Sequence, residues 1–261
     1  MDDLLMRAYE SPSRLAELTL YLAATPTSWW VIEEDERLLA VAGGLAFGNV
    51  AWLGLVATHP DARGRGFASR VSQRIVEWSR AQGCRTVALD ASEPGRPVYE
   101  RLGFAHVGWT AELLRPADAV PDGRRAVRAS RADVNALVAF DLEAFGGDRR
   151  SLLRALAGDP DAHWFVTRQT DGTLGGYLVV RGQRIGPAAA ADDESAYALL
   201  RAALDEAPAA RVLVPSGSAF AETLTALGFV EQRRLAHMRL GELALPPGRS
   251  RLVAQLSYAT G

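Results

Sequence analysis

The sequence predicts a layered fold of the α+β or α/β class, written twice along the chain. Three observations lead to this prediction. Strand-like runs alternate with segments of helical periodicity, and the same succession of elements occurs in both halves. In addition, 48% of the 261 residues are hydrophobic, which is enough for the core of one large domain or two small ones.

The elements of the first half follow from turn signals and periodicity. A polar turn between two apolar runs indicates a β-hairpin, and Val71, Ile75 and Trp78 recur at helical spacing. Gly103 marks the C-terminal end of a short helix. In order, we expect strands 29–32, 38–45 and 52–57, helix 68–82, strand 85–89, helix 96–102 and closing strands over 104–114.

The second half repeats this plan. Its strand-like runs cover 163–166, 174–180 and 184–186. Equivalent glycines lie 132 positions apart, at Gly44 and Gly176 and at Gly54 and Gly186. The two Leu-Gly-Phe turns, whose glycines are Gly103 and Gly228, lie only 125 positions apart. The second copy has therefore lost about seven residues where the first carries its most distinctive segment, so we expect one functional and one degenerate half.

The composition excludes several classes of protein. The formal charge is −2, so no excess of positive charge is available to neutralise nucleic-acid phosphates. The single cysteine, Cys84, cannot form an internal disulfide, and the acidic N-terminus lacks the features of a signal peptide. No run approaches the ~18 apolar residues of a membrane span. We expect a cytoplasmic protein that binds neither nucleic acid nor membrane.

The sharpest local motif is Arg63-Gly64-Arg65-Gly66-Phe67-Ala68, which lies between a predicted strand and a predicted helix. Glycines let the backbone approach a ligand closely. The N–H groups at the start of a helix favour an anion, and two arginines add positive charge. The motif is typical of a site for a diphosphate.

Three diphosphate ligands compete for this motif. A P-loop requires a lysine after its last glycine, and the sequence contains no lysine. A dinucleotide fingerprint can be matched with Gly64, Gly66 and Ser69, followed by Asp90. In that fold, however, the first glycine follows its strand almost directly, whereas here residues 58–63 intervene. The third ligand is coenzyme A.

For coenzyme A, the chain resembles the GNAT acetyltransferase superfamily in two motifs. The Arg/Gln-x-x-Gly-x-Gly/Ala signature of that family is filled by Arg63, Gly66 and Ala68. Its Tyr-x-x-x-Gly-Phe motif is filled by Tyr99, Gly103 and Phe104. The two motifs occur in the right order and at the right spacing, which makes the resemblance specific.

The resemblance extends over nearly the whole chain. Segments 89–99, 145–149 and 185–187 are similar to a bacterial subgroup in which a second, atypical GNAT domain follows the first. It implies two tandem GNAT-like domains, each with a mixed, mostly antiparallel sheet flanked by helices. The Pro/Asp/Gly-rich stretch 115–123 marks the boundary, so we expect a domain with the acetyl-CoA site at 1–117 and a degenerate domain at 118–261.

The resemblance also implies which residues hold the co-substrate, acetyl-CoA, and that no metal is needed. Backbone groups of the strand before the motif would bind the pantetheine and polarise the thioester carbonyl, and amides of the motif would bind the diphosphate. The implied cofactor-binding residues are Val56, Ala57, Thr58, Arg63, Gly64, Arg65, Gly66, Phe67, Ala68 and Ser69.

For catalysis the resemblance implies direct attack of an amine, without an acyl-enzyme. Tyr99 would protonate the leaving thiolate as general acid; otherwise its ring simply packs on the core. The family's usual glutamate is absent from residues 49–57. We therefore name Asp90, at the end of a predicted strand, as candidate base. Its alternatives are a role in capping the turn at Ser92 and Gly95, and deprotonation through a chain of water.

The acceptor is expected to be a small-molecule amine of unknown identity. Residues 1–25 leave little room for the first strand and two helices that normally wall the acceptor site. We therefore expect the second domain to contribute, with Asp148, Arg149 and the region of Trp164; alternatively Asp148 and Arg149 cap a helix. The oligomer is expected to be a monomer or homodimer. Two other functions stay open: a non-catalytic acyl-CoA sensor or interaction module, and a nicotinamide-dependent enzyme.

Overall fold

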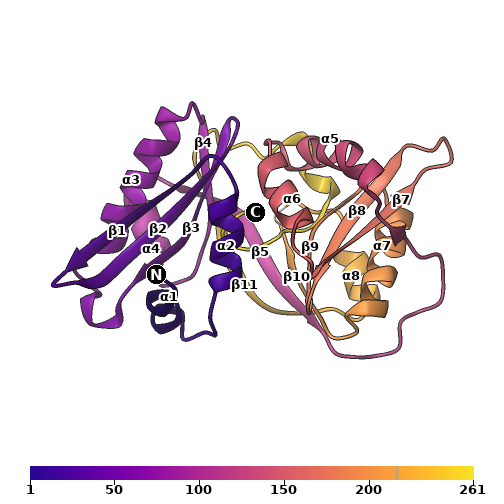
Figure 1. Ribbon diagram of the computed structural model, residues 1–261, viewed down its shortest axis with the longest axis horizontal. Helices are drawn as coiled ribbons and strands as arrows, with labels where there is room; N and C mark the ends of the chain where they lie inside the picture. Colours follow the sequence, from indigo (N-terminus) through magenta and orange to yellow (C-terminus); the bar gives the residue numbers. More distant parts are fainter. Residues whose placement is uncertain (216) are drawn as a thin grey trace. The chain divides into compact units, whose positions relative to one another are not determined.

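The computed structural model describes residues 1–215 and 217–261 and confirms the mixed α and β class (Figure 1). The chain forms two compact units. The first comprises residues 1–107, 236–243 and 260, and the second comprises residues 108–235, 244–259 and 261. Strands β5 (Ala105–Arg115) and β11 (Val230–Gly241) each have residues in both units.

The first unit contains a mixed, mostly antiparallel sheet in the order β1-β2-β3-β4-β11. Strands β3 and β4 are parallel, and the other neighbours are antiparallel. Residues 236–241 of β11 pair with β4, so a segment far along the chain completes this sheet. The other elements are α1 (Asp2–Tyr9), α2 (Leu15–Ala23), β1 (Thr27–Glu34), β2 (Arg37–Phe47), β3 (Val50–Thr58), the 3-10 turn η1 (Pro60–Ala62), α3 (Phe67–Ala81), β4 (Thr86–Ala91) and α4 (Arg96–Arg101).

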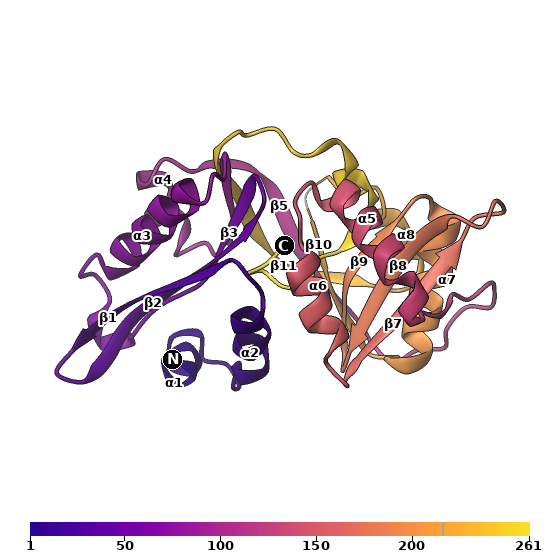
Figure 2. The same ribbon diagram turned by 45° about the horizontal axis from the view of Figure 1, so that its top comes forward.

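Both faces of this sheet are covered. Helix α3 buries Phe67, Val71 and Ile75 against small and branched residues of β2, β3 and β4. Figure 2 shows α3 and α4 on one side of the β1–β3 sheet and α1 and α2 on the other. Strand β2 is buried along most of its length, as expected for a strand covered on both faces.

The N-terminal segment differs from the expectation in one respect. Two helices do fit before β1, because α1 has eight residues and α2 has nine. Leu4 and Leu5 of α1 and Leu18 and Tyr21 of α2 are buried. What the described residues lack is a strand ahead of these helices. The two helices for which residues 1–25 left little room are therefore present in the first unit.

The second unit repeats the architecture with the sheet order β5-β10-β9-β8-β7-β6, and β12 pairs with β9. Its core packs α7 and α8 against one face of β8, β9 and β10. The elements are β6 (Val127–Arg128), η2 (Arg131–Asp133), α5 (Val134–Phe145), α6 (Arg150–Ala157), β7 (Ala162–Arg168), β8 (Leu174–Arg181), β9 (Arg184–Ala190), α7 (Asp193–Glu206), β10 (Ala210–Val214), α8 (Ala221–Ala226), η3 (Pro247–Arg251) and β12 (Leu252–Ala254).

The elements expected from periodicity all form, with ends shifted by a few residues. Residues 104–114, expected to hold closing strands, form the single strand β5. Over residues 1–215 and 217–261, no helix is long and apolar enough to cross a bilayer.

Candidate functional site

The candidate site begins where strands β3 and β4 part. Their parallel pairing covers three positions and ends at Trp52 opposite Ala88. Beyond this point β3 contains Leu55, whose φ of 49° is left-handed, and the β2–β3 register shifts beside it. A branched side chain in that region marks a strained bulge. Beyond the bulge, Ala57 and Thr58 stay paired to β2. The pairing with β4 does not continue past Trp52, which leaves the β4-facing edge of β3 open.

Thr58, one of the predicted cofactor residues, carries a polar atom suited to a ligand at this edge. Its Oγ1 is buried, and no hydrogen-bond partner for it lies among the described residues. Ala57 is buried and Val56 packs against the core of the unit. Since a buried hydroxyl without a partner is unfavourable, a ligand or water at this position would be stabilising.

The glycine motif forms a turn into helix α3. Gly64 and Gly66 adopt φ values of 78° and 76°, and Gly66 is the N-cap of the helix. A Cβ at either glycine would meet nothing within 4 Å, so the conformation, not crowding, calls for glycine here. The first turn of α3 carries no acidic residue and no side-chain cap.

The backbone N–H groups of this turn are available to a ligand. Within the described part of the chain, none of the N–H groups from Gly64 through Ser69 donates to a backbone or side-chain acceptor. Successive N–H groups at a helix start form a concave anion site, and the helix dipole adds to it. This geometry fits the diphosphate that the sequence predicts for residues 63–69.

The two arginines of the motif are engaged within the unit. The Arg63 Nη2 donates to the carbonyl of Ala8 at 3.0 Å, which ties the loop to the end of α1. The Arg65 guanidinium bonds both carboxylate oxygens of Glu34 at 2.8 Å. Glu34 therefore partly neutralises Arg65, whereas Arg63 keeps its positive charge beside the amides of the loop, because the Ala8 carbonyl is neutral.

Tyr99 lies on α4, half-buried, with its ring edge-on to Phe104 at a centroid distance of 5.9 Å. Burial raises the pKa of the Tyr99 hydroxyl above its ordinary value. The ring thus packs on the core, as a structural tyrosine would, while the phenol stays protonated and able to donate. Both interpretations of Tyr99 are compatible with this placement.

A second tyrosine, which the sequence did not single out, lies beside this strand. The Tyr9 hydroxyl, at the end of α1, donates to the carbonyl of Val56 at 2.9 Å. Burial and then the proximity of Tyr99 raise the pKa of Tyr9. The Tyr9 hydroxyl therefore lies at the open part of β3. No motif could have pointed to Tyr9, because its contact joins residues 47 positions apart.

Asp90 lies on β4 directly opposite His237 of β11. The Asp90 Oδ1 and the His237 Nδ1 are 2.9 Å apart, and both side chains are fully buried. The His237 ring stacks on Trp52 with centroids 5.6 Å apart. In the turn that follows, the Oγ and the carbonyl of Ser92 both accept from the N–H of Gly95.

Three further residues named in the sequence analysis, Cys84, Asp148 and Arg149, make contacts typical of structural residues. Cys84 is buried, its thiol lies 3.3 Å from the Gly48 carbonyl, and burial raises the pKa of that thiol. Asp148 accepts from the N–H of Arg150 at the start of α6, as a cap does. Arg149 is instead buried in a bidentate ion pair with Asp141 at 2.6 and 3.1 Å. Among the described residues no group of His, Cys, Asp and Glu is arranged to hold a metal.

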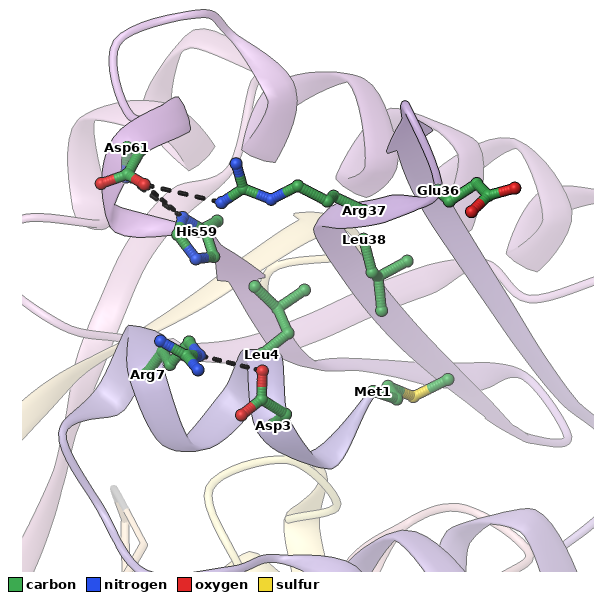
Figure 3. Close-up of a pocket in the computed structure, with 9 residues that line it drawn as sticks. All are labelled: Met1, Asp3, Leu4, Arg7, Glu36, Arg37, Leu38, His59 and Asp61. Carbon is green, nitrogen blue, oxygen red and sulfur yellow. Dashed lines mark hydrogen bonds and ion pairs between the residues drawn. The ribbon is translucent and has the colours of Figure 1, made fainter.

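A cavity of about 410 Å³ opens between α1, the start of β2 and η1 (Figure 3). Its charges largely compensate one another. Arg7 bonds Asp3 at 2.9 Å, and Asp61 lies 3.6 Å from both Arg37 and His59. The residues that line the cavity all precede the glycine motif in the sequence. Because their charges are mixed, the cavity has no preference for an anion.

Comparison with known proteins agrees with the two motifs. Residues 1–104 match the model of the "Acetyltransferase (GNAT) family", and residues 137–254 match that of an "Acetyltransferase (GNAT) domain". The chain is 27% identical to the uncharacterized N-acetyltransferase YitH of Bacillus subtilis over 74% of this chain and 70% of that protein. It is 40% identical to a glucosamine 6-phosphate N-acetyltransferase of Trypanosoma brucei brucei, over 24% of this chain and 40% of that protein.

A solved structure shows the same fold. The crystal structure of a putative acetyltransferase from Pyrococcus horikoshii superposes with a TM-score of 0.87 at 22% identity, covering 99% of this chain and 90% of that one. The resemblance drawn from the two sequence motifs is thereby confirmed. The chain belongs to the GNAT acetyltransferase superfamily and carries two GNAT domains in tandem.

Proposed function

We propose that the protein transfers an acetyl group from acetyl-CoA to the amine of a small molecule, at a site in the first unit. The observation that carries the proposal is the run of unpartnered N–H groups from Gly64 through Ser69, next to the open edge of β3. The first offers a place for the diphosphate and the second a place for the pantetheine. Similarity to a glucosamine 6-phosphate N-acetyltransferase supports a small amine as acceptor.

The chain's own groups would act as follows. Backbone groups of residues 56–58 orient the thioester and polarise its carbonyl. The amine nitrogen attacks the carbonyl carbon, the carbon–sulfur bond breaks, and the Tyr99 hydroxyl gives its proton to the leaving thiolate. Holding both reactants on one edge lowers the entropic part of the barrier.

The proton lost by the amine needs an acceptor, and Asp90 remains our candidate base. Its hydrogen bond to His237 Nδ1 fixes the carboxylate and places an imidazole within 2.9 Å, which can share the proton. Tyr9 would act as a positioning residue. The Tyr9 hydroxyl donates its hydrogen bond to the Val56 carbonyl. The lone pairs of the hydroxyl oxygen can therefore accept a hydrogen bond from a substrate N–H.

The experiment is release of the coenzyme A thiol from acetyl-CoA, followed with a thiol reagent in the presence of small primary amines that include glucosamine 6-phosphate. We expect Tyr99→Phe to lower kcat by roughly 10- to 100-fold with unchanged acetyl-CoA affinity. Tyr197→Phe, which alters a half-buried tyrosine of the second unit, is the matched control and should keep full activity.

The alternative function is a non-catalytic acyl-CoA sensor. Such a protein would bind acetyl-CoA through the same amides but would show no turnover for Tyr99→Phe to reduce. Equal kcat in the wild type and Tyr99→Phe would remove Tyr99 from the mechanism. Acetyl-CoA binding with no thiol release for any amine would favour the sensor.

A further inference from the structure

The second unit has the same strand opening as the first. Strands β9 and β10 are parallel neighbours over only two positions, Arg184 opposite Arg211 and Ile185 opposite Val212. The next residue, Gly186, is the repeat equivalent of Gly54 and has a φ of 135°. Beyond it, β9 and β10 part, as β3 and β4 do beyond Trp52.

In the second unit this opening is filled by the chain itself. Strand β12 pairs with β9 on one side, with Leu252 opposite Ala189 and Ala254 opposite Ala188. On the other side, the N–H of Gln255 donates to the carbonyl of Leu213 in β10 at 2.8 Å. A peptide segment therefore bonds to the edges of both strands, where the pantetheine of a coenzyme would otherwise bind to the backbone.

The fit of this segment is close. A Cβ built on Gly186 would lie 2.1 Å from the Gln255 carbonyl oxygen, so the backbone of the segment touches the backbone of β9. Val253 and Ala254 are fully buried in the core of the unit. Leu256 is 4% exposed, and Ser257 is 3% exposed. Removing this segment would uncover the core, so it is an integral part of the fold.

The phosphate end of the second opening is also occupied. Helix α7 corresponds to α3, but its N-cap is Asp192, whose carboxylate accepts from the N–H of Ser195 at 2.8 Å. Asp193 and Glu194 follow in the first turn. Helix α3 has neither a carboxylate cap nor an acid at this place. Carboxylates at a helix start satisfy the free N–H groups and repel a phosphate.

We infer that the second unit carries a built-in occupant of its coenzyme site: residues 252–257 replace the pantetheine arm, and Asp192 replaces the diphosphate. The full chain therefore binds one acetyl-CoA, in the first unit, and the second unit serves as a fixed scaffold. This inference rests on the proposed function of the first unit.

The test is a calorimetric titration of acetyl-CoA into the full chain, with the number of sites as readout. Gly66→Asp places a carboxylate in the amide turn of the first unit. Gly48→Asp is its matched control, because Gly48 has a φ of 73° and open space around its Cβ, as Gly66 does. We expect one site in the wild type and in Gly48→Asp, and none in Gly66→Asp, with thermal melting showing that all three fold.

A second variant tests the occupant directly. Asp192→Ser keeps an N-cap side chain but removes its carboxylate, so Asp193, Glu194 and the segment 252–257 still block the second opening. In the Gly66→Asp background we expect Asp192→Ser to leave acetyl-CoA binding absent. Two sites in the wild type, or one site that appears only when Asp192→Ser is added to Gly66→Asp, would overturn the inference while leaving the proposed function intact. An absence of binding in the wild type would instead overturn the proposed function, and the inference with it.

Discussion

Polar side chains in this protein either lie at the candidate site or are fully enclosed in hydrogen-bonded clusters that stabilise the fold. The Tyr9 hydroxyl reaches the Val56 carbonyl of β3, and the hydroxyls of Tyr9 and Tyr99 both stay protonated, because the loss of solvation raises the pKa of each. The pair Asp141 and Arg149, in contrast, is closed on itself in the second unit, where the Tyr177 hydroxyl also bonds Asp141. A sequence shows the residue types in such clusters but not which are fully enclosed.

The raised pKa of Tyr99 predicts how activity depends on pH. A general acid must be protonated, so deprotonation of Tyr99 should not reduce kcat near pH 10, the ordinary value for tyrosine. The folded state holds this proton more tightly than the unfolded state. The stability it contributes is therefore complete below about pH 10 and is lost as the pH rises further. A kcat profile between pH 7 and 10 checks this. A basic limb below pH 10 that disappears in Tyr99→Phe would contradict it.

The buried ion pair of the second unit predicts a large loss of stability. Arg149→Met leaves the Asp141 carboxylate buried without its charged partner, both side chains being 1% exposed. We expect the free energy of unfolding to fall by about 3–5 kcal/mol. The neighbouring exposed pair, Arg150 with Asp148, provides the control. Arg150→Met should cost under about 1 kcal/mol. Equal losses in urea unfolding would show that burial is not what matters here.

At the scale of elements, the loop from η1 into α3 and the bulge in β3 create the candidate coenzyme site. Residues 64 and 66 are left-handed glycines, and Leu55 is a left-handed residue within a strand. The sequence predicts the first feature, because two glycines before a periodic helix are visible in the chain. It does not predict the second, because nothing about a leucine in an apolar run signals a positive φ.

The loop conformation predicts a separation between binding and stability. Alanine at Gly66 or Gly48 is forced into the left-handed region, so each variant should lose about 1–2 kcal/mol of stability. Only Gly66→Ala should weaken acetyl-CoA binding, by roughly tenfold or more, because it disturbs the free amides of α3. Thermal melts and acetyl-CoA titrations of both variants check this. Similar affinities in the two would show that the amides do not hold the coenzyme.

The pairing of strands that lie far apart in the chain could not be predicted from the sequence. The elements with strong local periodicity, such as α3 and the β1–β2 hairpin, form close to where they are expected. His237, however, faces Asp90 across 147 positions, and no local pattern reports such a register. The short helices α1 and α2 are also not predicted from the sequence. Helices of this length depend on tertiary packing for their stability, and local patterns do not show that packing.

At the scale of the whole molecule, the two units are interleaved along the chain. The chain leaves the first unit after residue 107 and re-enters it at residue 236. Residues 236–241 supply the last strand of the first sheet, including His237. The second half of the sequence is therefore not a separable domain in the sense of a beads-on-a-string arrangement.

This connectivity predicts the result of shortening the chain. A chain of residues 1–123 lacks β11, which exposes the edge of β4 and removes the partner of Asp90. An uncovered hydrophobic edge promotes aggregation, so we expect no cooperative melting transition and no acetyl-CoA binding. Circular dichroism and calorimetry measure both. A shortened chain that melts cooperatively and binds acetyl-CoA with full affinity would show that β11 is dispensable.

The central claim is that acetyl-CoA binds along β3 and the turn before α3, in the first unit. Amide hydrogen exchange of the full chain, with and without saturating acetyl-CoA, tests it most directly. We expect the coenzyme to slow exchange at residues 56–58 and 64–69 and to leave residues 191–196 and 252–257 unchanged. Protection at 191–196 or 252–257 without protection at 64–69 would contradict this account.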